Sequence, residues 1–173
     1  YSGDNLLRHR AAEALGSACA VVGDKDSGIV SKLLQGLFYS ITDTAAFPLG
    51  AFEAIGEIIG QRPDLYGGYT PQLYQFTGDV SRRIDALKAL GRISKTQAPF
   101  IRKHTLYFFA FFEDQNPSVR GYTAWLMGNL GAHEARKDLE KLLDEPHEIE
   151  IYETGNIKKM SVGEIASEAL NKL

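Results

Sequence analysis

The chain has 173 residues, of which 44% are apolar and 24% charged, and its formal net charge is −3. This balance is ordinary for one globular domain and gives no sequence-wide attraction to nucleic acid or to an anionic membrane. Cys19 is the only cysteine, which excludes an internal disulfide and a zinc site built on several thiolates. The longest strongly apolar run, residues 106–112, is far shorter than the roughly 20 residues that span a bilayer. We therefore expect a cytoplasmic protein of one domain, residues 1–173, without a membrane segment.

Apolar residues with helical spacing predict two alternating sets of helices along the chain. In chain order, the stripes occupy residues 7–18 (first set), 30–41 (second set) and 52–59 (first set). An irregular insert follows over residues 61–78, in which Thr70-Pro71 favours the start of a short helix. The alternation then resumes with residues 84–93, 100–112, 119–130 and 135–143. The order is therefore first helix, second helix, repeated.

A short phrase recurs in the first set: a small or apolar residue, a second one, and a glycine. It ends at Gly16, Gly56, Gly91 and Gly128, and a form without glycine ends at Asn171. The spacings of 40, 35, 37 and 43 residues are typical of helical repeats joined by loops of variable length. A glycine inside a helix costs about 1 kcal/mol relative to alanine, so we expect each one to let a neighbouring helix approach closely.

Local signals place several element boundaries. Asp79 and Asn116 are candidate N-caps, the second followed by Pro117 at the first helical position, and Gly131 suits the left-handed residue after a helix. Alternating residues 148–152 and 157–162 flank Gly155-Asn156, a pair typical of two-residue turns, and predict a β-hairpin over 148–162 with acidic residues opposite lysines. A capping box of Ser161 and Glu164 begins a final helix over 161–173.

The residues from Asp114 to Arg120, followed by the phrase ending at Gly128 and a leucine-rich segment, resemble one unit of the HEAT-like repeats first noted in phycobilisome lyases. Residues 8–16 and 80–91 match the first helix of that pattern. The resemblance implies an all-α, right-handed α-solenoid of about five helix pairs with a small β-hairpin near the C-terminus, used as a scaffold for protein contacts. It also implies structural ladders, with Asp114 bound to Arg120, and Asp79 bound to one of the following arginines.

Few residues suggest catalysis. The dipeptides His133-Glu134 and His147-Glu148 are similar to the paired ligands of di-iron hydroxylases built on HEAT repeats, but those enzymes use four such pairs and this chain has two. We interpret them as polar residues at a helix start and in a loop. Cys19 has only apolar neighbours that would lower no thiol pKa, so we interpret it as a core residue. We therefore expect no catalytic residue, no metal and no cofactor, with a metal- or bilin-dependent enzyme as the alternative.

Small basic groups such as Arg82-Arg83 and Arg136-Lys137 leave a second alternative, a nucleic-acid-binding HEAT-like protein. Acidic residues interleave the second group at spacings that favour solvated pairs within one helix, which argues against this alternative. The aromatic block of residues 106–112 is apolar on nearly every helical face and predicts a buried helix, with His104 and Tyr107 nearest to solvent.

We predict a non-catalytic protein-protein interaction scaffold or adaptor, whose second helices line a concave surface for a protein partner. The residues predicted to contact that partner are polar or aromatic and lie in second helices: Lys32, Gln35, Lys103, His104, Tyr107, Arg136 and Lys137. Leu6 and Leu7 of the first helix would need cover from an upstream repeat or from a second copy, so a homo-oligomer stays open.

Overall fold

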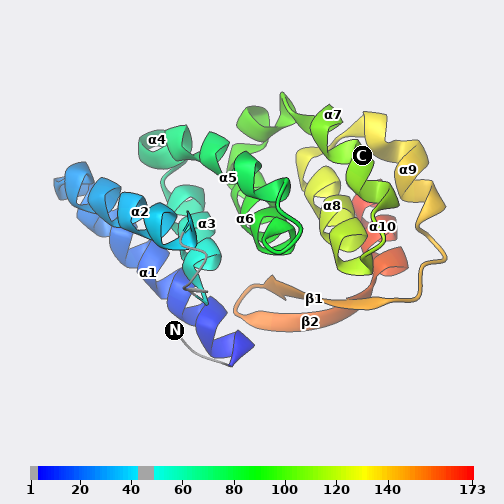
Figure 1. The fold of residues 1–173 in the computed structure, drawn as a ribbon, viewed down its shortest axis with the longest axis horizontal. Coiled ribbons are helices and arrows are strands. Elements are labelled where there is room, and N and C mark those ends of the chain that lie inside the picture. Colours follow the sequence, from blue (N-terminus) through cyan, green and yellow to red (C-terminus); the bar gives the residue numbers. More distant parts are fainter. Residues whose placement is uncertain (1–3, 43–48) are drawn as a thin grey trace.

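The computed structural model of the chain describes residues 4–42 and 49–173. It is mostly helical (76%), with helices packed against one another and a small two-stranded antiparallel sheet. The helices are α1 (Asn5–Lys25), α2 (Ser27–Thr42), α3 (Ala51–Gln61), α4 (Pro63–Tyr66), α5 (Thr70–Thr77), α6 (Arg83–Arg102), α7 (Thr105–Phe108), α8 (Pro117–Leu130), α9 (Arg136–Lys141) and α10 (Val162–Asn171), and the strands are β1 (Glu148–Glu153) and β2 (Asn156–Ser161) (Figure 1). No helix among the described residues is long and apolar enough to cross a membrane.

The helices that carry the repeated phrase pack in chain order: α1 on α3, α3 on α6, α6 on α8, and α8 on α10. The repeated glycines lie at these contacts, as expected. A Cβ added at Gly128 would lie 2.7 Å from Cα of Ala169 on α10, and one at Gly91 would lie 2.1 Å from the ring of Trp125 on α8. The prediction that glycine allows close approach of the next helix is thus confirmed, and we call these five helices the first-helix layer.

The second-helix segments are more broken than the sequence indicated. Residues 61–78 form α4, a 3-10 helix η1 (Gly67–Tyr69) and α5, which begins at Thr70 as expected. The second helix predicted over 100–112 is not continuous. Instead α6 runs on to Arg102 through non-helical dihedrals at Gln97, two residues before Pro99, and α7 and the 3-10 helix η2 (Phe109–Glu113) follow. Proline removes a backbone donor and restricts the residues before it, which accounts for the break.

Most predicted caps are confirmed. Asn116 caps α8 by accepting a hydrogen bond from the backbone N–H of Ser118, and Gly131 ends that helix with a positive φ of 58°. Both hydrogen bonds of the capping box between Ser161 and Glu164 are present at the start of α10. Asp79 does not cap α6, because that helix begins four residues later and Asp79 instead accepts from the backbone and hydroxyl of Ser81.

One of the two expected arginine contacts is confirmed, since Arg82 Nε lies 3.6 Å from the carboxylate of Asp79. The other arginines pair in a different register from the one expected. Arg83 binds the carboxylate of Asp114 at 2.5 Å, and Arg120 binds the carboxylate of Glu145 at 2.6 Å. Arg120 also reaches Asp114, but through the backbone carbonyl oxygen. Arg83 and Arg120 therefore each pair with an acid that comes later in the chain, which ties α6 to the segment before α8 and α8 to the segment before β1.

The hairpin follows the predicted alternation, with Glu150 opposite Lys159. Its turn residues are Thr154 and Gly155, both at positive φ, instead of Gly155 and Asn156. Asn156 belongs to β2, where it pairs with Glu153. A threonine at positive φ is uncommon because a β-branched side chain crowds that conformation, so the pairing of the strands sets this turn against local preference.

The aromatic block and the lone cysteine lie where burial was expected. Phe108, Phe111 and Phe112 are buried, and so is Cys19. Tyr107 is exposed, as predicted, but Leu106 is also 74% exposed. The broken geometry of α7 and η2 turns that leucine outward, although the segment is apolar throughout.

Candidate binding pocket beneath the hairpin

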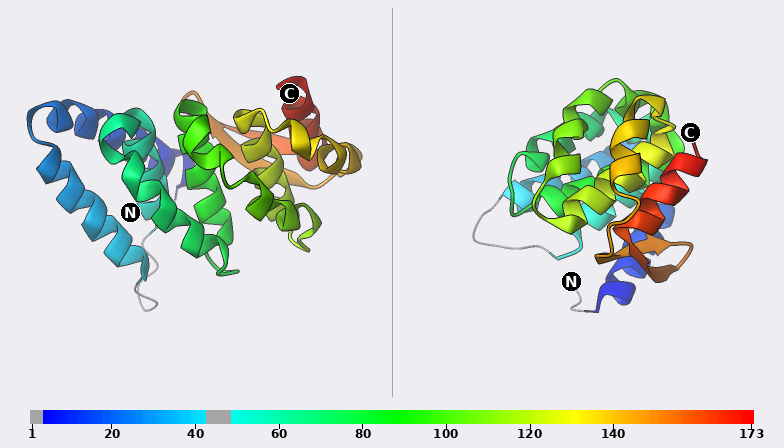
Figure 2. Two further views of the ribbon diagram at one scale, coloured as in Figure 1. Left: turned by 90° about the horizontal axis from the view of Figure 1, so that it is seen from above. Right: turned by 90° about the vertical axis from the view of Figure 1, so that its right-hand side faces the viewer.

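The β-hairpin crosses one side of the first-helix layer and reaches α1 (Figures 1 and 2). Near the turn, the side chain of Arg10 on α1 donates to the carbonyl oxygen of Gly155 at 3.0 Å. Along β1, the Tyr152 hydroxyl donates to the carboxylate of Glu13, and the Tyr152 ring stacks on His9 with centroids 4.6 Å apart. The hairpin therefore links the first helix of the chain to the helices beside its own end.

A pocket lies between β1 and the first-helix layer, and we call it the hairpin pocket. Its cavity volume is about 40 Å³, and the empty space rises to about 440 Å³ when the open solvent at the mouth is included. Its charged lining residues are Glu53, Glu57, Lys88, Arg92 and Glu150. They come from α3, α6 and β1, so the pocket exists only where the hairpin covers the stacked helices.

The helical lining residues occupy equivalent positions of successive repeats. Glu53, Lys88 and Trp125 each lie three residues before the repeated glycine, and Glu57 and Arg92 each directly follow it. Residues four apart share one face of a helix. Because the glycines bring neighbouring helices close together, these positions form adjacent rows that face the hairpin.

Glu57 is the most buried charged side chain of the pocket, with 4% of the residue exposed. It lies in the middle of the apolar helix α3, and Arg92 Nε donates to its Oε1 at 2.6 Å. Its second oxygen, Oε2, has no hydrogen-bond partner among the described residues. A buried carboxylate usually has its acceptor sites filled, so this oxygen marks an unmet requirement for a donor.

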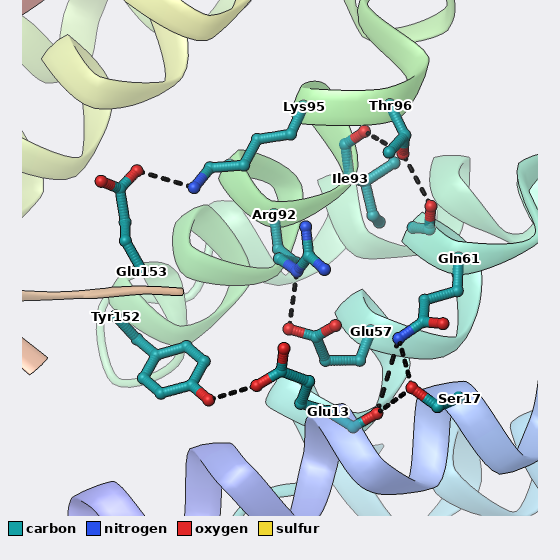
Figure 3. A network of polar contacts seen from close by, with 12 residues as sticks. Glu13, Ser17, Glu57, Gln61, Arg92, Ile93, Lys95, Thr96, Tyr152 and Glu153 are labelled. Atoms are coloured by element: carbon teal, nitrogen blue, oxygen red, sulfur yellow. Dashed lines mark hydrogen bonds and ion pairs between the residues drawn. The ribbon is translucent and has the colours of Figure 1, made fainter. Parts of the chain in front are cut away.

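Further polar contacts hold the helices around Glu57 in place (Figure 3). Gln61 Nε2 donates to the hydroxyl oxygen of Ser17 at 3.0 Å and so joins α3 to α1. Lys95 Nζ binds the carboxylate of Glu153 at 2.6 Å and joins α6 to the hairpin. Every helix that lines this end of the pocket is therefore tied to a neighbour by a polar side chain.

Aromatic rings form the remaining wall, with Tyr122 and Trp125 on α8 and Tyr152 on β1. Two of these rings contact ammonium groups of the chain itself. Lys88 Nζ lies 5.3 Å from the centroid of Tyr122, and Lys95 Nζ lies 5.1 Å from that of Trp125. The negative faces of aromatic rings attract such cations.

Burial shifts the titration of the groups that line the pocket. Burial and the hydrogen bond to Glu13 raise the pKa of Tyr152 to about 12, so its hydroxyl stays protonated and donates at neutral pH. Burial lowers the pKa of His9, which keeps that ring neutral at pH 7. Burial, with the nearby charges of Asp85 and Glu150, raises the pKa of Tyr122. With carboxylate acceptors and rings held in place, the pocket has the chemistry of a binding site.

The seven residues predicted from the sequence to contact a partner lie elsewhere, in second-helix segments. They occupy α2 (Lys32, Gln35), the two residues between α6 and α7 (Lys103, His104), α7 (Tyr107), and α9 (Arg136, Lys137). All seven are exposed, and none lines the hairpin pocket. Their role in binding stays a prediction.

The two histidine-glutamate dipeptides are not brought together into a metal site. Across residues 4–42 and 49–173, no group of three or more His, Cys, Asp or Glu side chains is placed to hold a metal ion. Glu134 accepts a hydrogen bond from the hydroxyl of Thr105 at 3.0 Å, and His147 Nδ1 contacts the carboxylate of Glu145. Glu134 therefore binds a residue of α7, whereas His147 contacts only a neighbour two residues away.

Sequence reasoning missed Glu57, Arg92 and Tyr152. The available signal for the two helical residues was their position after the repeated glycine, since a charged residue there lies within an apolar helix. Tyr152 gave no comparable signal, because its role depends on a contact with α1 across 139 residues of chain.

Comparisons with models of protein families, with curated proteins and with solved structures found no match.

Proposed function

We propose that this chain is a non-catalytic interaction scaffold, built as a HEAT-like solenoid, that binds a protein partner through its second-helix side. The observation that carries this proposal is the set of large apolar side chains exposed in second-helix segments, with Tyr39 78% and Leu106 74% exposed. Exposed apolar surface rimmed by polar residues is typical of protein contact sites. Here the exposed Lys103 precedes the exposed Leu106 by three residues in the chain.

The packing of the first-helix layer supports the solenoid form. Each helix of that layer contacts the next in chain order, so each repeat meets its neighbours, and the arginine pairs of Arg83 and Arg120 run between successive repeats. Such stacks leave one helix of each pair available along an extended surface, which suits binding to a macromolecule.

Two arginines already make contacts within the protein, which favours a protein partner over nucleic acid. Arg83 is engaged by Asp114, and Arg102 donates to the carbonyl oxygen of Leu130 at 2.7 Å. A guanidinium that serves a structural contact has fewer donors left for a phosphate. Of the basic residues that suggested a nucleic-acid stripe, Arg83 and Arg102 thus support the fold, whereas Arg136 and Lys137 stay exposed.

Charge reversal on the proposed surface tests the function. Affinity capture followed by quantitative mass spectrometry would compare the wild type with the double variant Lys103→Glu, Arg136→Glu. We expect a defined set of proteins to be captured by the wild type and lost by the double variant. Lys158→Glu, an exposed lysine on the hairpin, is the matched control and should retain that set. Identical capture by the wild type and the double variant would contradict the proposal.

A further inference from the structure

The geometry points to an alkylammonium ligand for the hairpin pocket: a primary ammonium group that donates to Glu57 while its alkyl chain lies against the aromatic wall. This site lies on the first-helix layer beneath the hairpin, and none of its lining residues belongs to the proposed protein-binding surface. The inference therefore does not depend on the proposed function.

Glu57 is the first reason. Its side chain is 5% exposed, it lines the pocket, and one of its two oxygens has no partner among the described residues. The terminal torsion of a glutamate is soft and roughly two-fold, so a small rotation can present that oxygen to a ligand. A charge-assisted hydrogen bond from an ammonium group would satisfy it and is about twice as strong as a neutral one.

The charge around the pocket is the second reason. Glu57, Glu53 and Asp85 pair with Arg92, Arg8 and Lys88, respectively, and Glu153 pairs with Lys95. Within residues 4–42 and 49–173, Glu13 and Glu150 have no ion-pair partner, and the hydrogen bonds they accept come from neutral donors, the Tyr152 hydroxyl and the Asn5 amide. Two further cations lie on the surrounding elements: Arg10, which donates to the carbonyl oxygen of Gly155, and Lys159, which lies opposite Glu150 on β2. They offset the charge of Glu13 and Glu150, but neither forms an ion pair with these carboxylates among the described residues, so both acceptors stay open to a cationic donor.

The rings of the pocket are the third reason. The ammonium groups of Lys88 and Lys95 already rest on Tyr122 and Trp125, so primary ammonium chemistry is compatible with this wall. Apolar groups of Ala89 and Ile151 complete the lining and would contact an alkyl chain. A ligand that donates to Glu57 and packs its chain here would use both kinds of surface.

Trp125 provides a direct readout, because it is the only tryptophan and its ring lines the pocket. Titration with n-butylammonium chloride, followed by Trp125 fluorescence and by the NMR shift of its indole N–H, should give a saturable change. Tetramethylammonium has the charge but no donor, and n-butanol has the chain but no charge. We expect both to bind at least about tenfold more weakly, the cost of losing a charge-assisted hydrogen bond.

Two variants connect the signal to the site. Glu57→Gln should weaken n-butylammonium binding about tenfold or more, whereas Glu168→Gln, an exposed acid on α10, should leave it unchanged. If Glu57→Gln does not fold, Glu150→Gln leaves the Glu57–Arg92 pair intact and should still weaken binding a few-fold through its lost charge. Titration with Nα-acetyl-lysine N-methylamide separates two sources of the ammonium group. Binding of both probes supports a site that also accepts a lysine side chain, and binding of n-butylammonium alone supports a free amine.

The inference is overturned if n-butylammonium gives no saturable change up to about 50 mM, a range that covers millimolar affinity. It is also overturned if tetramethylammonium binds equally well, or if a folded Glu57→Gln protein binds as tightly as the wild type. Either of these two results would mean that the Glu57 carboxylate does not accept a hydrogen bond from the ligand.

Discussion

The charged residues beneath the hairpin are mostly held in ion pairs, whereas those of the second-helix segments α2 and α9 are mostly exposed to solvent. Beneath the hairpin, Glu57 is 4% exposed and lies 2.6 Å from Arg92, and two further ion pairs join Glu53 to Arg8 and Glu153 to Lys95. On the second-helix side, Lys103 and Arg136 are exposed and take part in no ion pair within the described part of the chain. The same repeat therefore places charged residues in a dry environment on one side and in a wet one on the other.

This difference has an energetic meaning. A charge removed from water must be paired and hydrogen-bonded, so removing one partner leaves the other at a large cost. A charge in water costs little to keep and little to remove, because solvent screens it. Substitutions beneath the hairpin should thus change stability, whereas substitutions on the second-helix side should change binding alone.

The largest expected effect comes from Arg92→Met, which leaves the Glu57 carboxylate buried without its cation. We expect the free energy of unfolding, measured with urea, to fall by about 3 kcal/mol. The double variant Glu57→Gln, Arg92→Met should recover part of that loss, because no buried charge remains. Lys103→Met on the other side should change stability by less than about 0.5 kcal/mol. Equal effects of Arg92→Met and Lys103→Met would remove the contrast between the two sides.

Glycine substitutions compare the packing of the first-helix layer, at Gly128, with that of the second-helix segment α2, at Gly36. In Gly128→Ala the new Cβ would lie 2.7 Å from Cα of Ala169, so α8 and α10 must separate, and we expect a loss of about 2 kcal/mol in urea unfolding. Gly36 lies on α2 with no atom within 4 Å of an added Cβ. Gly36→Ala should therefore raise stability by up to about 1 kcal/mol through helix propensity. Destabilisation by both variants would show that Gly36 also has a packing role.

Much of the fold follows from local signals in the sequence. The caps at Asn116, Gly131 and Ser161 were predictable because each depends on residues only a few positions away. The repeated glycines predicted the close helix contacts, since a costly residue inside a helix needs a compensating contact. The turn at Thr154 and Gly155 was not predicted, because pairing along the whole hairpin outweighs the preference of the turn residues themselves.

The candidate pocket could not be predicted from residues that are close in the sequence. It forms only when β1 docks on α1, and the contact between Tyr152 and Glu13 joins residues from opposite ends of the chain. The phase of the repeat could have placed Glu57 and Arg92 side by side, because both directly follow a repeated glycine. The spacing of the repeated glycines could not indicate that the hairpin would cover this pair and complete the pocket.

The variant Tyr152→Phe tests how much the contact between the hairpin and α1 contributes to stability, and we expect a moderate effect. Loss of the hydrogen bond to Glu13 should lower the free energy of unfolding by about 1 kcal/mol at pH 7. The pKa of Tyr152 is raised from its ordinary value near 10 to about 12, so its contribution is full below pH 10 and is lost as the pH rises toward 12. The difference between wild type and variant in urea unfolding should therefore shrink over that range. A difference that stays constant from pH 8 to pH 12 would contradict the role of the hydroxyl, and Glu168→Gln serves as a control without a tyrosine change.

The smallest expected effect belongs to Lys32→Ala and Gln35→Ala on α2. Both side chains are exposed and alanine favours a helix, so each change in the free energy of unfolding should stay within about 0.5 kcal/mol. The measurement is urea unfolding at two protein concentrations about tenfold apart, because stability that depends on a second copy would vary with concentration. A loss above about 1 kcal/mol that grows on dilution would mean that α2 is covered by another copy of the chain. The second-helix side would then be dry as well, and its exposed charges would belong to an interface between copies.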